Sequence, residues 1–113
     1  MPGTEASLAF AADEPVGFIL ARQAADEAEI VTIGTRPFAQ RSGVATALLD
    51  HQFLAFRAHG AKSCFIEVAR SNVPGFALYG KCGFRETGVR RGYYARDGGL
   101  TEDAAVLRKD LSP

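Results

Sequence analysis

The segment that most constrains the fold is residues 32–49, TIGTRPFAQRSGVATALL, which has the pattern of a strand, a short loop and the start of a helix. Pro37 ends the strand because a proline nitrogen cannot donate a hydrogen bond to a sheet ladder. Ser42 and Gly43 stand where a helix opens on the amphipathic run that follows. The segment therefore predicts a sheet strand and a helix joined by this loop.

The start of this predicted helix is suited to binding an anion. The first turn of a helix leaves backbone N–H groups without partners, and the aligned peptide dipoles place about half a positive charge there. Gly43 has no side chain to hinder close approach, Ala45 is small, and Thr46 adds a hydroxyl. The junction predicts a cradle for a phosphate or pyrophosphate, although junctions with one glycine also occur without a ligand.

The spacing of Gln40, Gly43 and Ala45 narrows the choice of anion. Residues 40–45, QRSGVA, fit the pattern Q/R-x-x-G-x-G/A, which resembles the acetyl-CoA pyrophosphate loop of the GCN5-related N-acetyltransferase (GNAT) family. The segment does not fit the dinucleotide fingerprint G-x-G-x-x-G, and no Gly-Lys-Ser/Thr follows, as a nucleoside triphosphate loop requires. The resemblance implies coenzyme A, with acetyl-CoA as the co-substrate.

Length and charge indicate one domain without a strongly charged partner. The 113 residues are expected to form a single domain, residues 1–113, around one core. The chain carries 13 basic and 13 acidic side chains, so its formal net charge is zero and predicts neither direct nucleic-acid binding nor membrane binding. Its apolar stretches fall far short of the roughly 20 residues that span a bilayer.

Cysteines and histidines give no sign of metal or disulfide chemistry. Cys64 and Cys82 form no C-x-x-C pair, and no secretory segment is recognisable, which predicts reduced thiols in a cytoplasmic protein. His51 and His59 lie on one predicted helix without a cysteine or carboxylate at a metal-ligand spacing. We therefore expect no metal cofactor.

The rest of the pattern predicts further strands and helices. Apolar runs at 7–12, 16–23 and 29–35, separated by acidic turn residues, indicate a meander of three strands. Apolar residues at steps of three and four predict a helix over 43–59, which Gly60 ends. The elements expected after it are a strand over 62–69, a helix over 72–81 and strands over 85–94 and 104–111. This pattern alone supports an α/β or α+β fold with a parallel strand pair around the long helix.

Glu67 is the first candidate for catalysis. On the strand over 62–69, Phe65, Glu67 and Ala69 share one face, so the carboxylate stands in an otherwise apolar row. A desolvated glutamate has a raised pKa, which suits it to take up a proton near neutral pH. The alternative is a solvated or ion-paired glutamate near the end of the strand, and the position is equally compatible with it.

Tyr79 is the second candidate. Asn72 or Ser71 offers a cap and Pro74 a first-turn residue for the helix that carries it. Phe76 and Tyr79 are three positions apart and share a face of this helix. A tyrosine that packs in the core with its hydroxyl at the edge and a tyrosine that acts as an acid are both compatible with the position.

Motifs in the second half of the chain strengthen the resemblance. The runs EVARSN at 67–72, ALY at 77–79, CGF at 82–84 and RRGYY at 90–94 occur in order. Together they resemble the ribosomal-protein-alanine N-acetyltransferases within the GNAT family, and with the cradle the resemblance extends over about residues 16–110. It implies an α/β (α+β) fold with a mixed, mostly antiparallel sheet, a central parallel strand pair and helices on both faces.

The resemblance also implies a role for each motif in direct acetyl transfer. Glu67 is expected to act as the general base on the acceptor's α-ammonium, and Tyr79 as the general acid that protonates the departing CoA thiolate. Asn72 is expected to reach the pantetheine arm. The backbone of Ile33, Gly34 and Thr35 is expected to bind the acetyl and pantetheine end of acetyl-CoA. The residues expected to hold the pyrophosphate are Arg41, Ser42, Gly43, Val44, Ala45 and Thr46.

The implied acceptor is a protein N-terminal α-amino group, with the alanine of a ribosomal protein first. A small-molecule amine, a lysine, or a CoA-binding module without catalysis are the alternatives. Arg91, Tyr93 and Tyr94 either line the acceptor side or pack at a strand end. Against the family's pattern the sequence starts at the second strand, so a truncated N-terminal wall, an unpaired edge strand and self-association through that edge are expected.

Overall fold

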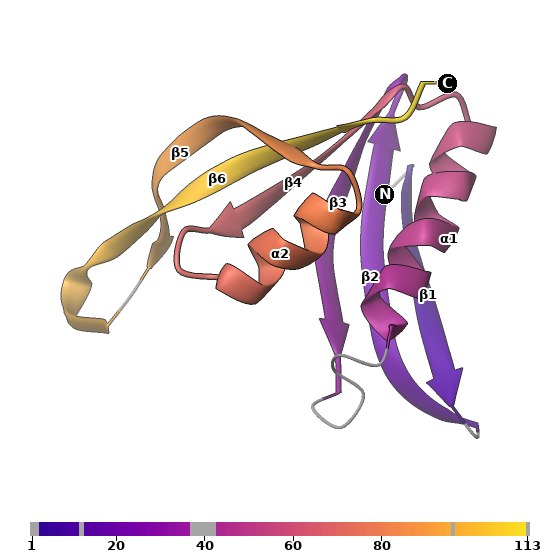
Figure 1. Cartoon of the computed structure of the whole chain (residues 1–113), viewed down its shortest axis with the longest axis horizontal. Coiled ribbons are helices and arrows are strands. Elements are labelled where there is room, and N and C mark those ends of the chain that lie inside the picture. Colours follow the sequence, from indigo (N-terminus) through magenta and orange to yellow (C-terminus); the bar gives the residue numbers. More distant parts are fainter. Residues whose placement is uncertain (1–2, 12, 37–42, 96, 113) are drawn as a thin grey trace.

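The computed structural model describes residues 3–11, 13–36, 43–95 and 97–112, within which six strands and two α-helices form (Figure 1). Each predicted strand and helix is present, with ends that differ by a few residues. A short 3-10 helix lies between the last two strands. In chain order the elements are β1 (Thr4–Ala11), β2 (Glu14–Ala24), β3 (Glu27–Thr35), α1 (Val44–Ala58), β4 (Ser63–Ala69), α2 (Val73–Lys81), β5 (Arg85–Ala95), the 3-10 helix (Asp97–Gly99) and β6 (Thr101–Asp110).

The strands form one mixed sheet in the order β1-β2-β3-β4-β6-β5. Strands β3 and β4 pair in parallel, and the remaining neighbours pair antiparallel. The parallel pair follows from the chain, because α1 connects the two strands as a crossover and no tight turn could reverse the direction. The predicted mixed, mostly antiparallel sheet with a central parallel pair is confirmed.

Both helices pack on the same face of this sheet, whereas helices on both faces were expected. Phe53 of α1 and Tyr79 of α2 each contact Phe84, with ring centroids 5.9 Å apart in both pairs. On β4, the side chains of Cys64, Ile66 and Val68 are buried beneath them, while the alternate residues from Phe65 onward are only half-buried. The apolar alternation of the strand therefore supports one core, on the helix-covered face.

The other face of the sheet carries exposed apolar side chains near β1. Gly17 faces α1, since a side chain there would meet Val44, so its neighbour Phe18 points away from the helix. Phe18 pairs with Leu8, and Leu8 and Phe10 share its face; their exposed fractions are 43%, 59% and 60%. Strand β1 is also an edge strand. The helix-free face thus presents exposed apolar side chains beside an edge strand.

Candidate active site

Strands β3 and β4 diverge, and this divergence organises the site. Their parallel ladder holds three residue pairs and ends at Glu29 and Phe65. Beyond it β3 continues to Thr35 beside β2, and β4 continues to Ala69 beside β6. Figure 1 shows the two strands leaving a common end in different directions. The facing backbone groups of both strands are consequently released from the ladder.

The released half of β3 contains Ile33, Gly34 and Thr35. The side chain of Ile33 packs against the core, and the ring of Phe18 occupies the space beside Gly34, where a Cβ would lie 2.7 Å from the nearest ring atom. A register irregularity of the β2–β3 ladder falls just before this segment, between Leu20 and Ala21 of β2. The side-chain positions of this segment are thus largely taken up by packing, so its backbone groups are what it can offer a ligand.

Helix α1 is the next described element after β3, and its N-terminus has no cap from a described side chain. Gly43 is the N-cap residue with φ 86°, a left-handed conformation that favours glycine. The first turn contains no acidic residue, and among the described residues no atom outside the chain neighbours lies within 4 Å of where a Cβ of Gly43 would be. The amides of Val44, Ala45 and Thr46 therefore stand at a positive helix end available to an anion. Arg41 and Ser42, which were also predicted to bind the anion, lie outside the described residues.

Glu67 is ion-paired, which is one of the two alternatives that its position allowed. Its Oε1 accepts a hydrogen bond from Nη1 of Arg90 at 2.7 Å, and its side chain is 25% exposed. Arg90 comes from β5, on the far side of β6. The guanidinium lies 4.4 Å from the centre of the Tyr93 ring, and the Glu67 contact raises the pKa of Arg90 above its usual value. The carboxylate is accordingly held in place.

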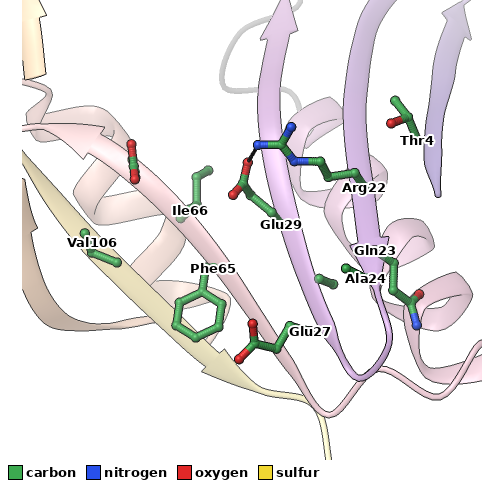
Figure 2. A pocket seen from close by; sticks show the side chains of 11 residues that line it. Thr4, Arg22, Gln23, Ala24, Glu27, Glu29, Phe65, Ile66 and Val106 are labelled. Atoms are coloured by element: carbon green, nitrogen blue, oxygen red, sulfur yellow. Dashed lines mark hydrogen bonds and ion pairs between the residues drawn. The ribbon is translucent and has the colours of Figure 1, made fainter. Parts of the chain in front are cut away.

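Glu67 also lines a pocket of about 490 Å³ on the helix-free face, at the paired end of β3 and β4. Arg22 and Glu29 form an ion pair on its wall at 2.7 Å (Figure 2). Carboxylates beside apolar groups suit an amine with an apolar neighbour. The lining residues are Thr4, Arg22, Gln23, Ala24, Glu27, Ala28, Glu29, Phe65, Ile66, Glu67 and Val106.

Tyr79 lies in the core on the helix-covered face, opposite the side of β4 that carries Glu67. Burial raises the pKa of Tyr79 to about 12, with smaller contributions from Tyr94 and Cys82. Tyr94 connects the two candidates, because its hydroxyl donates a hydrogen bond of 3.3 Å to the backbone carbonyl of Glu67. Burial also raises the pKa of Tyr94. Glu67 and Tyr79 are thus not in contact, but they share a neighbour at the diverging part of β4.

The two cysteines are poorly suited to act as nucleophiles. Burial raises the pKa of Cys64 to about 12 and also raises the pKa of Cys82 above its usual value. A thiol must ionise to attack a thioester, so neither side chain is in its reactive form near neutral pH. This favours direct transfer over an acyl-cysteine intermediate.

Asn72 has a structural task in the helix that carries Tyr79. Its Oδ1 accepts a hydrogen bond of 3.0 Å from the amide of Gly75 and so caps α2. A role toward pantetheine would therefore fall to its Nδ2 group. In the described part of the chain, no three His, Cys, Asp or Glu side chains gather as metal ligands would, and neither helix is long and apolar enough to cross a membrane.

Comparison with proteins of known family shows to which family the chain belongs. Residues 2–84 match the sequence model of the acetyltransferase (GNAT) family. The chain belongs to this family. A curated relative, the [ribosomal protein bS18]-alanine N-acetyltransferase of Escherichia coli (strain K12), is 35% identical over 95 residues. These residues are 84% of this chain and 64% of the relative, so the chain spans about two thirds of the relative's length.

Solved structures show the same GNAT fold. The crystal structure of the ribosomal-protein-S18-alanine N-acetyltransferase from Escherichia coli superimposes with a TM-score of 0.91 at 29% identity, covering all of this chain and 72% of that one. A Bacillus subtilis acetyltransferase in complex with CoA superimposes with a TM-score of 0.86 at 24% identity, covering 99% of this chain and 80% of that one. The predicted family and fold are confirmed.

Sequence reasoning did not assign a role to Arg90 and left that of Tyr94 open. Strand alternation places Arg90 and Tyr94 on one face of a regular strand, which was a usable signal. Their contacts with Glu67, however, depend on how β5, β6 and β4 align. The GNAT site is therefore assembled from strands whose mutual register no local pattern reveals.

Proposed function

We propose that this GNAT chain transfers an acetyl group from acetyl-CoA to a protein N-terminal α-amino group. The observation that carries the proposal is the divergence of β3 and β4 between Glu67 and the α1 N-terminus, which no described side chain caps. An alanine-beginning ribosomal protein is the first acceptor to test, since the E. coli relative bears that activity in its name. Such an acceptor places the reaction in the cytoplasm and requires no direct contact with nucleic acid or membrane.

Acetyl-CoA would lie along the released edge of β3 and end at α1. The CoA complex of the B. subtilis structure supports this co-substrate for the fold. Backbone N–H groups on β3 would hold the acetyl carbonyl and stabilise the oxyanion that forms on it. The helix N-terminus would bind the pyrophosphate. The residues proposed for acetyl-CoA are Ile33, Gly34, Thr35, Arg41, Ser42, Gly43, Val44, Ala45, Thr46 and Asn72.

The acceptor would enter from the pocket on the helix-free face, and Glu67 would act as its general base. An α-ammonium has no lone pair, so it must lose a proton before its nitrogen can attack the thioester carbon. Glu67 accepts that proton. The new C–N bond forms the tetrahedral intermediate, which then breaks its C–S bond and releases the CoA sulfur with the bonding electron pair.

Tyr79 would serve the departing sulfur from the opposite face. Its pKa of about 12 keeps the phenol protonated near neutral pH, the form in which it can donate. Complete proton transfer to a thiolate with a pKa of about 8.5 is uphill by about 5 kcal/mol. Tyr79 would therefore stabilise the departing thiolate by donating a hydrogen bond to it. The second proton that the nitrogen loses, as the intermediate collapses to the amide, balances the one that the CoA sulfur gains.

A CoA-binding module without catalysis is the second candidate function. It is favoured by the separation of Glu67 and Tyr79 on opposite faces of β4. A small-molecule amine or a lysine are further acceptors within the enzyme proposal, because the pocket carboxylates attract any cation. The exposed edge of β1 and its apolar neighbours support self-association as the remaining partner.

The proposal is tested by thiol release from acetyl-CoA with peptides that begin in Ala, Ser or Met, and with an N-terminally blocked lysine peptide. We expect Glu67→Gln to lower kcat by about 10²- to 10⁴-fold and Tyr79→Phe to lower it more weakly, with acetyl-CoA affinity retained. Glu86→Gln, which removes an exposed carboxylate paired with Arg70, is the matched control. Wild-type rates in both site variants would refute the roles. Binding of acetyl-CoA without turnover would favour the module.

A further inference from the structure

Arg90 meets Glu67 through a single contact. One nitrogen, Nη1, donates to one oxygen, Oε1, at 2.7 Å. The Oε2 atom makes no hydrogen bond with the residues that the structure describes. The ion pair of Arg70 with Glu86 differs, since two nitrogens donate to both oxygens at 2.8 and 2.5 Å. The Glu67 pair thus fixes the carboxylate and leaves half of its acceptor capacity open.

The fold holds Arg90 in this position independently of Glu67. In the β5–β6 ladder Arg90 faces Ala104 and Tyr94 faces Glu102, so three residues of β5 oppose Asp103 alone. Gly92 lies in this bulge with φ 60°, and its amide donates a 2.8 Å hydrogen bond to the Asp103 carboxylate. The bulge brings the Tyr93 ring under the Arg90 guanidinium.

The path of Arg90 to Glu67 crosses the strand between them. Glu67 faces Val106 of β6, and Val106 faces Gly88 of β5. Arg90 lies two positions further along β5 on the same face, so its long side chain reaches back over β6. Tyr94 holds the other side of the same residue by its hydrogen bond to the Glu67 carbonyl. Side chain and backbone of Glu67 are both anchored from β5.

We propose that Arg90 is a positioning residue, which anchors Oε1 of Glu67 so that Oε2 is presented to the α-ammonium of the acceptor. The inference rests on the proposed function and adds to it the group that orients the base. The carboxylate is fixed before the acceptor arrives, and it belongs to a side chain that lines the pocket from which the amine would enter. A freely rotating carboxylate would have to be ordered during each turnover.

The experiment compares acetylation by the wild type, Arg90→Ala, Arg90→Lys and the matched control Arg70→Ala, which removes an exposed ion pair elsewhere. We expect Arg90→Ala to lower kcat about tenfold without changing KM for acetyl-CoA. This is a fraction of the roughly 10²- to 10⁴-fold that a general base typically contributes to the rate. Arg90→Lys restores most of the rate, because one donor suffices for the contact. Arg70→Ala turns over like the wild type, and thermal unfolding verifies that each variant is folded.

A double-mutant cycle separates positioning from mere structural support. If Arg90 acts through the base, Arg90→Ala causes no further loss of turnover in the Glu67→Gln background. If the wild type acetylates and Arg90→Ala turns over like Arg70→Ala, the inference is wrong and the proposed function stands. The same holds if the losses of turnover from Arg90→Ala and Glu67→Gln multiply in the double variant. A wild type that binds acetyl-CoA but acetylates no amine overturns the proposed function, and the inference with it.

Discussion

Gly17 on β2 is the residue where packing and acetyl-CoA binding meet most directly. A Cβ at this position would lie 2.9 Å from Cγ1 of Val44, 3.1 Å from the Gly34 carbonyl oxygen and 3.2 Å from Cδ1 of Leu48. Two of these atoms belong to the first turns of α1, and the third belongs to the released half of β3. The substitution Gly17→Ala should therefore push the N-terminus of α1 away from the sheet.

The cost follows from the crowding. Forcing one methyl group into a packed core costs about 1–3 kcal/mol, and alanine recovers about 0.5–1 kcal/mol because it loses less backbone entropy than glycine. The expected net loss is about 1–2 kcal/mol. A chain of this size then melts roughly 4–8 °C lower. Because the displaced turn carries the amides proposed for the pyrophosphate, acetyl-CoA affinity should fall as well.

Thermal unfolding by circular dichroism and calorimetric titration with acetyl-CoA measure the two effects. Gly80→Ala is the matched control, since the space around Gly80 is open and it lies near the end of α2. We expect this control to raise the free energy of unfolding by about 0.5–1 kcal/mol through helix propensity. A Gly17→Ala protein as stable as the wild type would refute the argument. So would an unchanged affinity in a destabilised protein.

Two further predictions concern pH and association. The free energy of unfolding should fall as pH rises above about 9. The Cys64 thiol ionises there in the unfolded chain, whereas in the folded chain its pKa of about 12 keeps it protonated. The loss from Cys64 is about 2 kcal/mol at pH 10.5, and urea titrations of the wild type and Cys64→Ala check it. Light scattering should show self-association that Leu8→Lys on β1 suppresses; a monomeric wild type contradicts this.

Local sequence patterns were enough to predict the strands, the helices and the family resemblance. Gly43 and the apolar steps along 43–59 act through local backbone geometry, so the helix that follows β3 was predictable, whereas Pro37 and the loop lie outside the described residues. The alternation around Glu67 placed it on the face of β4 opposite Cys64, Ile66 and Val68, and the structure shows that its own face is the less buried one. The cap of α2 was narrowed to Ser71 or Asn72, and the structure shows Asn72, whose partner lies only three residues away. Interactions of this kind are decided within a few residues of chain.

The positions of Glu67 and Tyr79 relative to each other and to their partners depend on the tertiary structure. It showed both helices on one face, which leaves Tyr79 and Glu67 on opposite sides of β4. It also chose the ion-paired alternative for Glu67 and supplied the partner, Arg90. Arg90 lies 23 positions further along the chain, and its contact depends on strand register and on the bulge before Tyr94. Register is set by the packing of the whole sheet, so no local pattern encodes it.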